Sequence, residues 1–130
     1  MSEMVEVKTA EIEGASLDWA VAKAVGHDVS FGRWGPMHWG AIIPQPVPLA
    51  PDQTVPFNPS MNWAQGGPLI DKYIGLSCVD SKVFGQPFYA ETKCTDMGAY
   101  ANGHTYLVAS MRAIVAAEMG ETVQVPKELA

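Results

Sequence analysis

The sequence has few of the groups from which common metal and redox sites are built. Among 130 residues it has 2 cysteines and 3 histidines. Cys78 and Cys94 are spaced like no zinc motif. His27, His38 and His104 show neither H-x-H nor H-E-x-x-H spacing. No metal and no cofactor are therefore expected. The two cysteines are interpreted as small apolar residues on neighbouring strands, because a cytosolic disulfide is rare.

Motifs for nucleophilic catalysis and for phosphate loops are also missing. A catalytic Ser or Cys needs a base beside it, but Ser77 and Cys78 fall in an expected strand and no G-x-S-x-G elbow is present. Neither a Walker motif nor G-x-G-x-x-G occurs. We therefore expect a protein that is not an enzyme.

Positive charge is scarce as well. Lys and Arg number 8 against 14 acidic residues, for a net charge of −6, and the basic residues are scattered singly. Because polymeric nucleic acids are bound mainly through clustered Lys and Arg, DNA or RNA polymers are unlikely partners, whereas a small anionic ligand remains compatible. Long apolar runs and a signal-peptide pattern are absent, so we expect a cytoplasmic protein without a membrane partner.

What is present suits one globular domain spanning residues 1–130, with 48% hydrophobic residues. Apolar residues at three- and four-residue spacing predict two helices, Ser16–Val25 and Thr105–Met119. Ser16 and Thr105 are the expected N-caps, and a glycine follows each helix.

Two short strands, Tyr73–Val79 and Phe88–Cys94, are predicted between the helices. A further strand is possible at Met37–Ile43, and Glu121–Val125 alternates like a short strand. Eight of the ten prolines lie between Pro36 and Pro68, which predicts a long Pro/Gly-rich loop around Pro44–Pro51. The fold class is therefore α+β, with two helices packed on a small antiparallel sheet.

Several stretches carry a resemblance to a known family. They are residues 8–11, 17–24, 59–70, 111–117 and 120–126. Trp63–Pro68 and the Val-x-Val-Pro end are the most specific. Together they resemble the phage NinX-like proteins, small accessory products of tailed phages and prophages. The resemblance implies phage origin and a non-structural role in the host cytoplasm, and it carries no catalytic residues.

The pair Gly66-Gly67 allows two interpretations. It is either a tight turn between a loop and a strand, or a nest of free backbone N–H groups for an anionic or carbonyl group. Gln65 beside it offers both a donor and an acceptor.

Aromatic side chains gather outside the predicted helices, at Trp34, His38, Trp39 and Trp63. They either clamp the long loop onto the domain or form a wall on which a flat heterocycle stacks. Arg33 can then supply charge for a phosphate. Trp19, within a helical pattern, is expected to pack in the core.

The leading hypothesis is non-catalytic binding and sequestration of a small nucleotide-like ligand, such as a host defence signal. The ligand-binding candidates are Arg33, Trp34, His38, Trp39, Asn62, Trp63, Gln65, Gly66, Gly67 and Arg112. Arg112 lies either on the surface or toward the Gly-Gly turn. One alternative is a protein–protein interaction module that inhibits a host protein through the Pro-rich loop. Another is a small nucleotide-cleaving enzyme. A homo-oligomer is expected.

Overall fold

The computed structural model describes residues 3–35, 38–44, 54–79, 82, 85–93 and 98–130. Within these ranges, the side chains of residues 33–35, 38, 39 and 54 are not described. Most of the predicted Pro44–Pro51 loop, residues 45–51, lies outside the described residues, so the structure does not test it.

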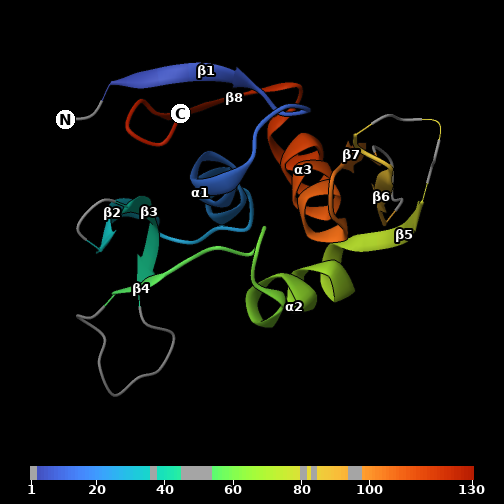
Figure 1. The fold of residues 1–130 in the computed structure, drawn as a ribbon, viewed down its shortest axis with the longest axis horizontal. Helices are drawn as coiled ribbons and strands as arrows, with labels where there is room; N and C mark the ends of the chain where they lie inside the picture. The colour runs from blue at the N-terminus through green and yellow to red at the C-terminus, as the bar shows by residue number, and fades with distance from the viewer. Residues whose placement is uncertain (1–2, 36–37, 45–53, 80–81, 83–84, 94–97) are drawn as a thin grey trace.

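The described chain forms three helices and eight short strands (Figure 1). The helices are α1 (Gly14–Ala24), α2 (Trp63–Tyr73) and α3 (Tyr106–Met119). The strands are β1 (Met4–Lys8), β2 (Ser30–Gly35), β3 (His38–Pro44), β4 (Thr54–Pro56), β5 (Ile74–Val79), β6 (Phe88–Thr92), β7 (Tyr100–Gly103) and β8 (Thr122–Pro126).

The strands form three small antiparallel sheets, where the sequence predicted one. The sheets have the orders β1-β8, β2-β3-β4 and β5-β6-β7. The α+β class and the pairing of the predicted strands at 73–79 and 88–94 are confirmed, because Val79 pairs with Phe88 and Cys78 with Tyr89. The strand β1 was not predicted. It pairs with β8 from the other end of the chain, with Val5 opposite Val125.

Helices α1 and α3 lie side by side in the middle of the molecule, with the three sheets around them (Figure 1). Helix α3 packs on β6, as predicted, and on β7, a strand that was not predicted, whereas α1 packs mainly on α3 and β3. Fully buried residues of the two helices form the core, among them Leu17, Val21, Met111 and Ile114. Trp19 is 6% exposed and packs in this core, as predicted.

The limits of α3 follow the sequence signals closely. Thr105 Oγ1 accepts a hydrogen bond from the backbone N–H of Val108 at 3.0 Å, which is the expected N-cap. Gly120 ends the helix with a φ of 90°. The prediction for α1 was less accurate, because the helix begins at Gly14 and Ser16 does not cap it. The Ser16 hydroxyl instead donates to the carbonyl of Glu13.

Helix α2 was missed, because Gly66, Gly67 and Pro68 all disfavour a helix interior. The helix nevertheless begins with a capping hydrogen bond, in which Asn62 Oδ1 accepts from the backbone N–H of Ala64 at 2.9 Å. Its first turns therefore occupy the segment for which a turn or backbone nest was predicted.

Candidate functional site

The N-termini of all three helices meet at one cavity of about 520 Å³. We call it the helix-start cavity. It is lined by Glu13 and Gly14 at the start of α1, by Ser60, Met61 and Trp63 at the start of α2, and by His104, Thr105, Leu107 and Val108 at the start of α3. The backbone dipoles make each helix N-terminus partially positive. The cavity therefore lies where three such ends converge.

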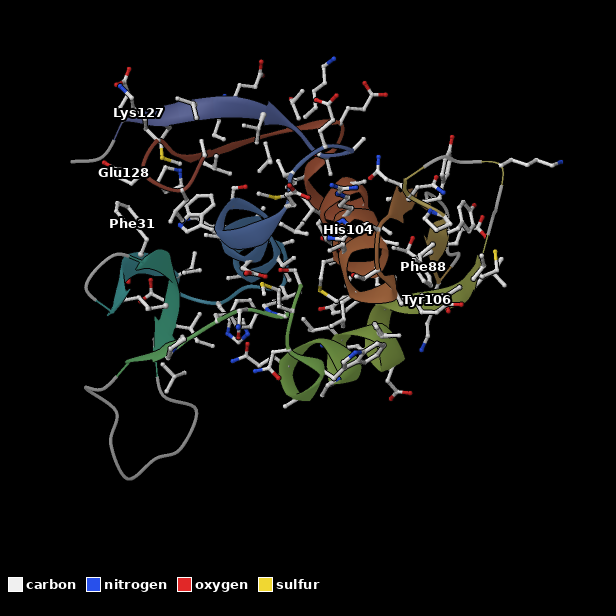
Figure 2. The ribbon with its side chains drawn as sticks, in the orientation of Figure 1. Phe31, Phe88, His104, Tyr106, Lys127 and Glu128 are labelled. Carbon is white, nitrogen blue, oxygen red and sulfur yellow. The ribbon has the colours of Figure 1, made fainter. Side chains whose placement is uncertain are left out.

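Two interactions hold these helix starts in place. Asp18, four residues after Gly14 and so on the same face of α1, accepts a hydrogen bond from the backbone N–H of Ser60 at 3.0 Å. At the start of α3, Tyr106 packs edge-to-face against Phe88 of β6, with 4.4 Å between ring centroids (Figure 2). The cavity wall is therefore anchored to the core on both sides.

Asp18 is a buried carboxyl, only 2% exposed. Burial raises its pKa to about 6, and hydrogen bonding from Ser60 offsets part of that rise. The Ser60 hydroxyl lies close enough to contribute to this effect, yet it has no hydrogen-bond partner of good geometry among the described residues. Ser60 is itself 3% exposed. A buried hydroxyl that is left without a partner beside a cavity is a candidate contact for a ligand.

The rim of the cavity is apolar and exposed. Trp63 is 58% exposed and Met61 is 75% exposed. A tryptophan ring and a thioether in this position offer a flat, polarisable surface to a ligand. Trp63, which the sequence analysis selected, therefore lines the cavity.

A pair of titratable groups also lies at the cavity. His104 Nδ1 is 3.8 Å from Glu13 Oε2, and both side chains are more than half exposed. Figure 2 labels His104, which directly precedes Thr105, the N-cap of α3. Sequence reasoning did not select these residues. The only available signal was that Glu13 directly precedes α1 and His104 directly precedes the N-cap of α3.

Two polar candidates from the sequence analysis are engaged within the chain itself. Gln65 Oε1 accepts from the backbone N–H of Asn58 at 2.7 Å, and Gln65 Nε2 donates to the carbonyl of Pro56 at 2.9 Å. Asn62 caps α2. Both side chains therefore fasten the chain segment after β4 onto the first turn of α2.

The two glycines are part of α2 and do not form the predicted backbone nest. The N–H of Gly66 donates to the carbonyl of Asn62 at 2.8 Å. A Cβ at Gly66 would lie 2.5 Å from the carbonyl oxygen of Pro59 and 2.6 Å from Leu107 Cδ2. Gly66 therefore allows α2 to pack closely on the chain before it and on α3.

Arg112 is buried, so neither of the two predicted positions for it is correct. Its guanidinium donates to the backbone carbonyls of Ile12, Glu11 and Asn102 at 2.7, 3.2 and 2.9 Å, and also to Gln86 Oε1. Burial lowers the pKa of Arg112, and the charges of Glu13 and Glu11 counteract that effect. The side chain ties the segment before α1 to β7 and to the segment before β6.

The remaining candidates lie in the β2–β3 hairpin, apart from α2 (Figure 1). The backbone of Arg33 pairs with that of Trp39, and Trp34 and His38 belong to the same hairpin. Their side chains are outside the described part of the structure. A single site formed by the hairpin and the Trp63–Gly67 segment therefore stays a prediction.

Cys78 lies on β5, within the predicted strand, and is exposed, whereas Cys94 lies outside the described residues. Within the described ranges, no group of three or more His, Cys, Asp or Glu residues gathers as a metal site. None of the described helices has the length and apolarity needed to cross a membrane.

The arrangement defines a small α+β protein whose three described helices start at a common cavity. The family model of NinX from bacteriophage P22 matches residues 8–118. The chain belongs to this family and is a NinX-like phage protein. No curated protein matches it.

Proposed function

We propose that this protein binds a small nucleotide-like ligand in the helix-start cavity and sequesters it without chemical change. The observation that carries the proposal is the exposed ring of Trp63 beside three converging helix N-termini. An aromatic face stacks on any nucleobase, for about 1–3 kcal/mol per base. Helix N-termini favour negatively charged groups such as phosphate. The cavity volume of about 520 Å³ is within the range of small-molecule sites.

Membership of a phage family suggests a biological role for this binding. A phage accessory protein in the host cytoplasm benefits from removing a nucleotide-like host defence signal, such as a cyclic oligonucleotide or an ADP-ribose derivative. This step is an analogy with other small phage proteins. A homo-oligomer remains our expectation, and light scattering that gives a 14.0 kDa particle would contradict it.

A nucleotide-cleaving enzyme is the second candidate, because Ser60 lines the same cavity as the Glu13–His104 pair. A carboxylate next to His and a nearby Ser are the groups of a hydrolytic triad. We favour binding alone, since the Ser60 hydroxyl makes no hydrogen bond to that histidine.

Native mass spectrometry tests the proposal directly. The purified protein is measured with and without a pool of mono-, di- and cyclic nucleotides, and the bound species is released and weighed. We expect one nucleotide mass, recovered intact. Recovery of a cleaved product would favour the enzyme. Absence of any nucleotide complex would refute the proposal and favour the protein–protein alternative.

A further inference from the structure

The three helix starts at the cavity differ in whether a side chain accepts a hydrogen bond from the first backbone N–H groups of the helix. The first N–H groups of any helix lack partners within the helix. In α2 the side chain of Asn62 accepts from Ala64 N, and in α3 that of Thr105 accepts from Val108 N. No side chain caps α1. The first turn of α1, which begins with the cavity-lining Gly14, is therefore the start that is left open.

Glu13 occupies the N-cap position of α1 but does not act as its cap. Its carboxylate instead faces His104 Nδ1 at 3.8 Å. The Glu13 carboxylate thus lies near the positive end of α1, beside His104. Gly14 follows with a φ of 62°, a conformation that favours glycine, and open space surrounds the position where a Cβ would lie. Gly14 itself therefore borders open space at the cavity.

Ser60 lies between the cavity and the buried Asp18 carboxyl. It lines the cavity, and its buried hydroxyl has no hydrogen bond of good geometry among the described residues, although it lies close enough to Asp18 to help lower the pKa of that carboxyl. Ser60 N–H donates to Asp18, one helical turn after Gly14, so Ser60 is held against the same face of α1. A serine hydroxyl beside an uncapped helix start can donate to a phosphate oxygen.

We infer that the first turn of α1 binds the phosphate of the nucleotide-like ligand, and that Glu13 competes with this phosphate for His104 and for the helix N-terminus. The inference rests on the proposed function and assigns the parts of the ligand to parts of the cavity. The base stacks on Trp63 and the phosphate lies between Gly14, Ser60 and His104. The Glu13 carboxylate turns away when the phosphate enters, so Glu13 weakens the binding of phosphorylated ligands relative to the uncharged nucleoside.

Charge substitutions test the competition. Glu13→Gln is expected to tighten AMP binding about threefold or more, because it removes a neighbouring negative charge, and to leave adenosine binding unchanged. Glu11→Gln is the matched control nearby, since its side chain is exposed and does not line the cavity. Glu118→Gln, at the other end of α3, is the distant control. Both controls should change AMP affinity by less than about twofold.

Inorganic phosphate provides a readout that does not depend on the base. In ¹⁵N-labelled protein, sodium phosphate should shift the amide signals of Gly14 and Ala15 saturably, whereas sodium chloride at equal ionic strength should not. His104→Gln should weaken the effect and Glu13→Gln should strengthen it. Unchanged or weaker phosphate binding in Glu13→Gln, or shifts confined to another part of the protein, would overturn the inference.

The outcomes separate the inference from the proposed function. If nucleotides bind in the pool experiment but phosphate does not reach the α1 amides, the assignment of the phosphate fails while the proposed function stands. If phosphate shifts these amides but no nucleotide binds, the anion subsite stands and the proposed function fails.

Discussion

The surroundings of Arg112 and the helix-start cavity are neighbouring regions that treat their polar groups differently. Arg112 donates to four oxygens that the chain itself provides. At the cavity, the start of α1 has no side-chain cap, the Ser60 hydroxyl has no described partner and Trp63 is exposed. The difference shows that a polar residue has a structural role when other groups of the chain take up all its hydrogen bonds, even if it lies in a stretch that the family shares. Unsatisfied groups are better indicators of a site.

Two glycines show the same contrast. Gly66 is needed because Pro59 and Leu107 approach too closely for any side chain, and its N–H is bonded within α2. Gly14 has free space around it and lines the cavity. The sequence alone therefore does not show whether a glycine is needed for close packing of the chain or leaves space for a ligand.

The largest effect on stability is expected for Arg112→Leu, which tests the structural role of Arg112. The substitution removes the donor of the buried Ile12 carbonyl and of the part-buried carbonyls of Glu11 and Asn102, and an unsatisfied buried group costs about 1–3 kcal/mol. We expect a loss of at least about 3 kcal/mol in the free energy of unfolding, measured by urea denaturation, or failure to fold. The free energy of unfolding of Arg112→Lys should lie between those of wild type and Arg112→Leu. Wild-type stability in Arg112→Leu would mean that Arg112 is not architectural.

Asp18→Asn tests the buried carboxyl that accepts a hydrogen bond from the cavity-lining Ser60. The folded pKa of about 6 lies above the ordinary value of 3.8 for an aspartate, so the folded state binds the proton more tightly. This group's contribution to stability is then greatest below pH 3.8 and is lost as pH rises through 6. At pH 7.5 we expect Asp18→Asn to be more stable by up to about 3 kcal/mol, because Asn can still accept from Ser60 N–H.

The advantage of Asp18→Asn should shrink between pH 6 and pH 4, as the wild-type carboxyl becomes protonated. Urea denaturation at pH 4.5, 6 and 7.5 gives the free energy of unfolding of both proteins. The difference between the two values at each pH measures the advantage, because the titration of the other carboxyls cancels. A variant that is less stable than wild type at pH 7.5 would show that the charged form of Asp18 stabilises the fold.

A pair of alanine substitutions tests the two adjacent glycines of α2. Gly66→Ala forces a Cβ against Pro59 O and Leu107, and should cost about 1–3 kcal/mol. In Gly67→Ala the Cβ meets Trp63 Cε3 at an ordinary 3.9 Å, so the variant should be neutral or about 0.5–1 kcal/mol more stable, because alanine favours helix. Thermal unfolding of the pair is sufficient. Equal effects at both positions would contradict the packing role of Gly66.

The sequence predicted well those elements whose signals are local. Helix α3 has its cap at Thr105 and its stop at Gly120, and both act as expected. Helix α2 could not be predicted, because its glycines oppose a helix and the contacts that favour it, with Pro59 and Leu107, are tertiary. The five-residue strand β1 is stabilised by β8 from the other end of the chain, a pairing that no local pattern reveals.

The candidate site was only partly predictable for a similar reason. Trp63 stood out as an aromatic residue without a strand or helical pattern to explain it. Glu13, Ser60 and His104 come from three segments that are far apart in sequence, and each looks ordinary by itself. Their common property, a position just before a helix, becomes informative only when the three helix starts are seen to converge.

The smallest expected effect on stability, and the sharpest on function, comes from Trp63→Ala. Because the ring is 58% exposed, its removal should change the free energy of unfolding by less than about 0.5 kcal/mol. Nucleotide binding should weaken by about tenfold or more, since a stacked base contributes about 1–3 kcal/mol. Trp63→Phe keeps an aromatic face and should retain most of the affinity. Titration calorimetry with the nucleotide found by mass spectrometry measures both variants, and circular dichroism confirms their fold. If Trp63→Ala folds and binds as tightly as wild type, the exposed tryptophan is not a stacking surface and the ligand must bind elsewhere.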